Sequence, residues 1–144
     1  MLAMDGWAFL NHLQRLRLRM IAAVGPLLRE QGLQASTLWL LTAVERHPHP
    51  TELCREMGLP APTISRLLKG LEAEGYLVRE TVPEDLRRYR FLLTPKGAAV
   101  QAEAHGLMEA AVGSMLLRLP LEDRADLDRI LALLANGEGD TVGK

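Results

Sequence analysis

Between residues 50 and 94 the chain carries a short helical pattern, a turn, a second helical pattern and two strand-like runs, in that order. The first helix is expected to open at Pro50 or Thr51, to span residues 52–57 and to end at Gly58, because proline suits a first helical turn and glycine a helix end. In the second pattern the apolar residues recur three or four positions apart, as on one buried helix face: Ile64, Leu67, Leu68 and Leu71. This order restricts the segment to a small unit of two helices followed by a hairpin.

The hairpin is predicted from two runs rich in β-branched and aromatic residues, 76–82 and 89–94. Residues 83–88 between them are polar and predict an exposed turn. The whole chain has 17 basic and 18 acidic residues, a net charge of −1, so its total charge does not argue for a polyanionic partner. Residues 86–96 do argue for such a partner, because they contain no acidic residue and four basic ones: Arg87, Arg88, Arg90 and Lys96.

A helix that exposes Ser65, Arg66 and Lys69 beside a hairpin with a basic tip suits double-stranded DNA. A helix fits the major groove, where arginine can bond to guanine. An arginine-bearing tip can lie against the neighbouring backbone or the minor groove. The predicted fold class is therefore mainly α with a small β-hairpin wing, a winged helix-turn-helix.

Helical patterns also flank this unit. Residues 7 to about 28 carry one apolar stripe: Leu10, Leu13, Leu16, Met20, Val24 and Leu27. Gly25 and Pro26 are expected to kink or end that helix, with Gly32 stopping any continuation. A second helix is expected through residues 38–44, ended by the turn at 47–50. Further on, Thr94 and Pro95 predict the start of a long helix reaching about Leu119, and a last helix follows Pro120.

Three segments are expected: an N-terminal dimerisation helix in 1–35, a DNA-binding lobe in 36–95, and C-terminal dimerisation helices in 96–144 with a frayed tail from Asn136. A winged helix does not need such apolar arms in order to fold. Two copies could pair their arms and bury the stripes that one copy leaves exposed. The sequence therefore predicts a homodimer.

Five short stretches resemble the MarR family of bacterial transcription regulators: 53–59 (LCREMGL), 63–68 (TISRLL), 71–79 (LEAEGYLVR), 85–88 (DLRR) and 93–97 (LTPKG). The most specific is the Asp-x-Arg of the wing followed closely by LTPKG. The resemblance covers nearly the whole chain. It implies a homodimer that binds a pseudo-palindromic operator in double-stranded DNA and that is often released by a small ligand or by cysteine oxidation.

The resemblance also implies roles for single residues. The recognition helix corresponds to Pro62 at its start, Thr63, Ser65, Arg66 and Lys69. Arg87 corresponds to the wing arginine that enters the minor groove and Asp85 to the acid that orients the wing, while Arg88 and Arg90 extend the basic surface. Two residues depart from the family pattern, because Pro60 and Gln34 stand where helix-capping side chains are common.

These observations predict a MarR-type transcription regulator, a repressor relieved by a small ligand. The alternative is a winged-helix protein interaction module that does not bind DNA, in which the basic residues are a solvated face. No Ser/His/Asp order, glycine-rich phosphate loop or paired carboxylates stand in a recognisable setting, so the chain is not expected to be an enzyme or to hold a cofactor.

A ligand cleft is a further hypothesis. Trp39, Trp7, His12 and Arg15 are candidates to bind a planar aromatic or phenolic effector, because aromatic surface and a cation suit such an acid. Trp39 has the competing interpretation of a core residue, since its neighbours Leu38, Leu40 and Leu41 are apolar.

The remaining features predict little chemistry. Cys54 is the single cysteine, which excludes an internal disulfide, and it is interpreted as a small buried residue rather than as a redox sensor. His47 and His49 are interpreted as part of a turn and not as a metal site. The sequence shows no apolar run of spanning length and no signal peptide, so a cytoplasmic location without a membrane partner is expected.

Overall fold

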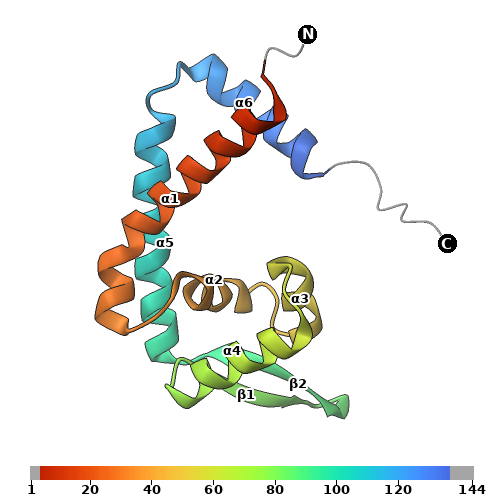
Figure 1. The fold of residues 1–144 in the computed structure, drawn as a ribbon. Coiled ribbons are helices and arrows are strands. Elements are labelled where there is room, and N and C mark those ends of the chain that lie inside the picture. Colours follow the sequence, from red (N-terminus) through yellow and green to blue (C-terminus); the bar gives the residue numbers. More distant parts are fainter. Residues whose placement is uncertain (1–3, 137–144) are drawn as a thin grey trace, which may run out of the picture.

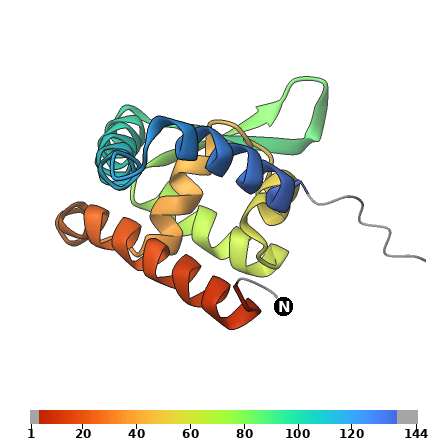
Figure 2. The same ribbon diagram turned by 90° about the horizontal axis from the view of Figure 1, so that it is seen from above.

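The computed structural model describes residues 4–136, and within them six helices and two strands. Three helices and the hairpin gather in a lobe, from which the other helices extend as arms (Figure 1). Seen from above, α5 stands end-on at one edge, whereas α1 and α6 extend across the molecule (Figure 2). In chain order the elements are α1 (Gly6–Gln31), α2 (Ala35–Val44), α3 (Pro50–Met57), α4 (Ala61–Ala73), β1 (Leu77–Val82), β2 (Asp85–Leu93), α5 (Pro95–Leu116) and α6 (Leu121–Ala135). The predicted fold class, mainly α with a β-hairpin wing, is confirmed.

The apolar core lies in the lobe and at its junction with the arms. Leu40, Leu41 and Leu53 are fully buried, and they pack with the predicted inner face of α4 and with the last turns of α1. The arms contribute only Val24 and Leu27 of α1 and, on α5, Val100 and Ala104 to this core. No residue of α6 is buried. Most of the apolar surface of the arms is therefore exposed in a single copy of the chain.

Helix ends follow the expected chemistry. Thr94 caps α5, its hydroxyl accepting a hydrogen bond from the amide of Gly97 at 3.1 Å. Gly58 ends α3 with φ 62°, a left-handed conformation that glycine adopts without a steric penalty. Helix α5 is three residues shorter than expected. The expected fraying of the tail falls on residues outside the described part of the chain, except for Asn136, which caps α6.

The sequence predicts that α1 kinks or ends at Gly25 and Pro26. The helix does not end there, because it continues to Gln31 and stops at Gly32. Proline in a helix interior removes one backbone hydrogen bond and crowds the preceding turn. Val24 and Leu27, on either side of Pro26, are 4% and 2% exposed. Burial of both residues in the core holds the two parts of α1 in one helix despite the local cost.

The wing is longer than predicted and its turn is shorter. Strand β2 begins at Asp85 instead of Tyr89, and only Pro83 and Glu84 form the turn. The strands are antiparallel, with Thr81 opposite Tyr89, and the register is irregular beyond that pair, where Val82 lies opposite Asp85. Residues 86–88 are exposed. No alternation of buried and exposed residues marks them as strand in the sequence, which therefore predicts them in the turn.

Candidate nucleic-acid interface

Helix α4 presents polar side chains on the face opposite its apolar stripe. Ile64, Leu68 and Leu71 are at most 1% exposed, and this anchors the helix against the lobe. Pro62, Arg66 and Lys69 are exposed, while Thr63 and Ser65 are half-buried. Pro60 stands at the N-cap without a side-chain cap, as Gln34 does for α2. The first amides of α4 therefore lack a side-chain partner from the cap residue.

The tip of the wing is braced by Asp85. Its carboxylate accepts a hydrogen bond from the backbone amide of Arg87 at 3.1 Å, the local bond for which aspartate is favoured in turns. Within residues 4–136, the side chains of Arg87 and Arg88 form no ion pair, so Asp85 orders the backbone of the tip without neutralising either guanidinium. Both arginines are exposed.

Arg90 differs from the other wing arginines. Its Nε lies 2.9 Å from Oε2 of Glu80, its cross-strand neighbour, and donates a hydrogen bond to it. Because side chains alternate along a strand, Arg90 points to the face opposite that of Tyr89 and Phe91, which line the hollow beside α4. The charge of Arg90 is thus paired with Glu80, and the expectation that Arg90 extends the basic surface stays a prediction.

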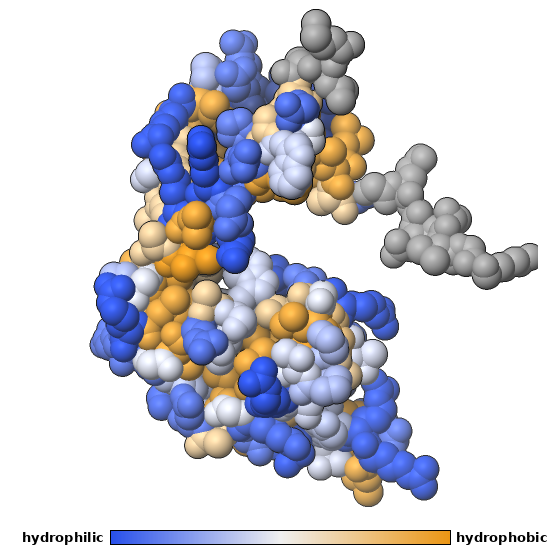
Figure 3. Space-filling view, in the orientation of Figure 1, coloured by the Kyte–Doolittle hydropathy of each residue, from blue (hydrophilic) through white to orange (hydrophobic). Residues whose placement is uncertain are grey.

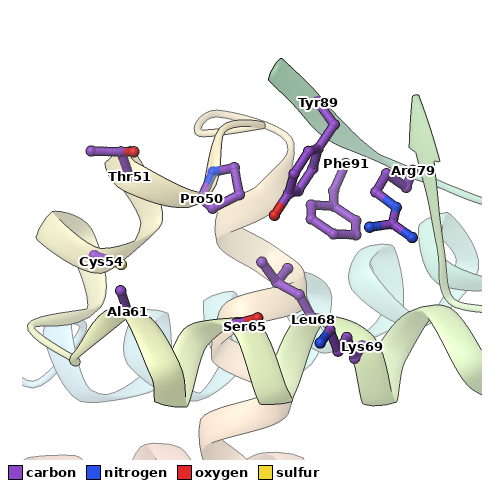
Figure 4. A pocket seen from close by; sticks show the side chains of 10 residues that line it. All are labelled: Pro50, Thr51, Cys54, Ala61, Ser65, Leu68, Lys69, Arg79, Tyr89 and Phe91. Atoms are coloured by element: carbon purple, nitrogen blue, oxygen red, sulfur yellow. The ribbon is translucent and has the colours of Figure 1, made fainter. Parts of the chain in front are cut away.

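A hollow of about 350 Å³ joins the elements of this surface (Figure 4). Ser65 and Lys69 of α4 and Thr51 of α3 line it together with Arg79 of β1 and Tyr89 of β2. The Arg79 guanidinium lies 5.3 Å from the centre of the Tyr89 ring, which itself meets Phe91 edge-on at 5.8 Å. The hollow is lined by residues of α3, α4 and both strands of the wing, and we call the surface that they form the α4–wing surface.

Sequence reasoning missed Arg79, Tyr89 and Thr51 at this surface. Strand alternation could have found Tyr89, because it is two positions from Phe91, an aromatic residue that is 3% exposed. Arg79 lies opposite Phe91 across the hairpin, and that pairing depends on the irregular register. Thr51 lies in the first turn of α3, and its place at this surface depends on how α3 packs beside α4, which no periodicity in the sequence describes.

The candidate ligand residues do not all meet in one copy of the chain. His12 and Arg15 line a shallow hollow on α1 with Leu16, Leu18 and Arg19, and Trp39 on α2 is not part of it. Trp39 is 49% exposed, so its interpretation as a core residue is wrong. Trp7 is 77% exposed near the start of α1.

Cys54 and His47 have structural surroundings. Cys54 is half-buried and packs against the core, at the edge of the hollow between α3 and α4. The imidazole of His47 lies 3.5 Å from the Glu56 carboxylate. In the part of the chain that the structure describes, no group of three His, Cys, Asp or Glu side chains could hold a metal ion. Nor does any helix there combine the length and the apolar content that crossing a bilayer requires.

Comparison with known proteins finds similarity to one family of transcription regulators. The family model described as the MarR family matches residues 31–88, which include α2, α3, α4 and most of the hairpin. The solved transcriptional regulator PA3341 is 27% identical to this chain, covers 91% of it and 96% of its own chain, and superposes with a TM-score of 0.75.

Two further solved structures are similar over comparable lengths. The repressor CouR, bound to a 23-mer DNA duplex, is 26% identical, with 90% of this chain and 91% of CouR covered at a TM-score of 0.75. A MarR-family regulator from Silicibacter pomeroyi is 25% identical, with 94% of each chain covered at a TM-score of 0.71. The matched lobe, the wing motif and the similarity along both arms agree, and the chain is similar to MarR-family regulators over nearly its whole length.

Proposed function

We propose that this chain is a homodimeric, sequence-specific DNA-binding transcription regulator that acts as a repressor. The observation that carries the proposal is a set of four cations on α4 and the wing that are exposed and have no ion-pair partner among residues 4–136: Arg66, Lys69, Arg87 and Arg88. Cations without a protein partner are available to replace the counterions of DNA phosphates. Because the net charge of the whole chain is −1, these four cations are a local excess of positive charge and not a reflection of the overall composition.

Helix α4 and the wing are proposed to contact different grooves of the DNA. Arg66 and Lys69 of α4 are proposed to enter the major groove, with Thr63 and Ser65 beside them and Pro62 at the helix start. Arg87 is proposed to reach the minor groove, with Asp85 holding its backbone and Arg88 next to it. The similarity to CouR, whose structure contains a DNA duplex, supports this assignment.

The homodimer is supported by the exposed apolar side chains of the arms. Leu10, Leu13 and Leu18 of α1 are 53%, 42% and 53% exposed, and Leu121 and Leu134 of α6 are 78% and 59% exposed. The space-filling view shows apolar areas over both arms (Figure 3). A second copy that pairs its segments 1–35 and 96–144 with these would remove them from water and place two α4 helices about 34 Å apart, one turn of DNA.

Relief by a small ligand is the remaining part of the proposal. His12 and Arg15 border a hollow on α1, and Trp39 offers half-exposed aromatic surface on α2, a combination that suits an aromatic or phenolic acid. We assign no catalytic activity to the chain, since the family that it resembles consists of transcription regulators. Because the chain is proposed to bind DNA, we also propose a cytoplasmic location for it.

The experiment is a titration of fluorescent duplexes with the purified chain at several salt concentrations. If each subunit neutralises about four phosphates, the slope of log K against log salt is about −7. An aromatic effector should then lower the affinity and quench the fluorescence of Trp39, with Trp7→Phe used to isolate that signal. A chain that binds no duplex even at low salt is instead the interaction module that the sequence left open.

A further inference from the structure

Tyr76 lies where the lobe meets both arms. It stands between α4 and β1 and is 2% exposed. Its phenol has two hydrogen-bond acceptors in Gln31, the side-chain Oε1 at 3.0 Å and the main-chain oxygen at 3.3 Å. Gln31 is the last residue of α1. One side chain of the lobe is therefore bonded to the end of the N-terminal arm.

The same residue also fixes the start of α5. The Tyr76 carbonyl accepts a hydrogen bond from the Thr94 amide at 3.1 Å, and Gly97 packs so closely against that carbonyl that a Cβ atom there would overlap it. The Lys96 ammonium lies 4.2 Å from the centre of the Tyr76 ring and donates a hydrogen bond to the Glu74 carbonyl at 2.8 Å. Both arms thus meet the lobe at one residue.

This junction sets the angle between lobe and arms. The described fold joins them through the end of α1 and the first half of α5 (Figure 1). The remaining contacts of these segments with the lobe are apolar, apart from the hydrogen bonds from the Gln101 side chain to the Glu45 carboxylate at 2.9 Å and from the Thr94 hydroxyl to the Gly75 carbonyl at 2.6 Å. Apolar contacts have little directional preference, whereas a hydrogen bond fixes both distance and angle. A directional bond at the pivot therefore restrains the rotation of α4 about the arms.

We propose that the Tyr76–Gln31 hydrogen bond is a positioning contact that sets the separation of the two DNA half-sites that a dimer accepts. The inference rests on the proposed function, because the separation has meaning only for a DNA-binding dimer. Tyr76 touches no DNA in this account. It acts through the angle at which each lobe holds its α4 helix.

The test uses Tyr76→Phe, which removes the hydroxyl and keeps the ring that packs in the core and faces Lys96. Affinities are measured for an operator obtained by selecting bound sequences from random duplexes, and for duplexes whose half-sites are one base pair closer or farther apart. The wild type is expected to prefer the selected spacing. The variant is expected to lose about threefold to tenfold of that preference, the effect of one lost hydrogen bond on an equilibrium constant.

Two further variants test the same hydrogen bond from its other end and control for the loss of any hydrogen bond. Gln31→Met removes the side-chain acceptor but keeps the main-chain oxygen at 3.3 Å, so it should reduce the spacing preference in the same direction and by less than Tyr76→Phe. Thr42→Ala is the matched control, since it removes a side-chain hydrogen bond that stays within α2, to the Trp39 carbonyl, and should leave the preference unchanged. Thermal unfolding shows that each variant is folded at the temperature of the binding assay.

The outcomes separate the two claims. An unchanged spacing preference in Tyr76→Phe and Gln31→Met, or an equal loss of affinity for every spacing, overturns the positioning role. A reduced preference with unchanged affinity for a single half-site supports it. If the wild-type chain binds no duplex at all, the proposed function itself fails, and that result is visible before any variant is made.

Discussion

Arg87 and Arg90 lie on the same strand and carry the same charge, but their surroundings differ. Arg87 has no ion-pair partner in the described chain and stands at the exposed tip, whereas Arg90 is bonded to Glu80 at 2.9 Å on the other face of the wing. Their comparison separates a free cation from a paired one. It is therefore the sharpest residue-level test of the α4–wing surface.

Arg87→Ala should weaken DNA binding and flatten the salt dependence by about two units of slope, one neutralised phosphate in each subunit. Arg90→Ala is the matched control and should change the slope little. Arg66→Ala should also relax the sequence preference, because α4 is proposed to read base edges. Titrations at several salt concentrations measure all three, and an equal effect of Arg87→Ala and Arg90→Ala would contradict the assignment.

Tyr76 also predicts how stability depends on pH. Burial, and to a smaller extent the negative charge of Glu74, raises the pKa of the Tyr76 phenol above its ordinary value of 10.0. The folded chain therefore keeps this proton at a pH at which the unfolded chain has lost it. The resulting stability is complete below pH 10.0 and is lost as the pH rises through the folded-state pKa.

Urea unfolding from about pH 8 to about pH 11 should show this decline, and the decline should be smaller in Tyr76→Phe, which has no proton to release. Comparing the two chains cancels the titration of groups that they share. A wild-type chain whose stability falls no more steeply than that of the variant would contradict the burial of a protonated phenol at this junction.

At the scale of the element, α1 shows where tertiary packing decides the outcome. Pro26 stands inside a helix that continues to Gln31 because Val24 and Leu27 are buried on either side of it. Pro26→Ala should therefore raise the free energy of unfolding by about 1 to 3 kcal/mol, since it restores a backbone donor and removes a steric clash. Thermal or urea unfolding measures the change, and a less stable variant would show that the proline is needed in this helix.

The helices of the lobe and the start of α5 could be predicted from local chemistry alone. Gly58 ends α3, Thr94 caps α5 and Ile64 begins a buried stripe, and each depends on neighbours within a few positions of the sequence. The wing could be predicted only as a hairpin. The start of β2 and the face that Arg90 occupies depend on cross-strand pairing, for which an exposed strand carries no hydrophobic pattern.

The candidate site also has residues that the sequence predicts and residues that only the folded structure brings together. Arg66 and Lys69 follow from helix periodicity, because residues opposite a buried stripe must face outward. Arg79 and Tyr89 enter the site only after the hairpin has folded against α4, and the Tyr76–Gln31 bond joins residues from two distant parts of the chain. No local pattern in the sequence predicts such contacts.

At the scale of the whole molecule, the exposed apolar side chains of the arms are proposed to form the dimer. Leu13→Glu places a charge on the exposed apolar stripe of α1, so it should convert the dimer into a monomer. Operator affinity should then fall about a hundredfold or more, because two half-sites are no longer bound together. Gln14→Glu adds the same charge at the neighbouring exposed position and serves as the control. Sedimentation measures the first effect, and a wild-type chain that is already monomeric at micromolar concentration would contradict the dimer.

The most direct measurement is selection of bound sequences from a pool of random duplexes by the purified chain. Two copies that each insert one α4 helix and one wing should enrich a two-fold symmetric sequence with half-sites about one helical turn apart. They should also enrich bases that α4 can read in the major groove. A pool that remains random after repeated rounds at low salt, or that yields a single unsymmetrical half-site, would contradict the account.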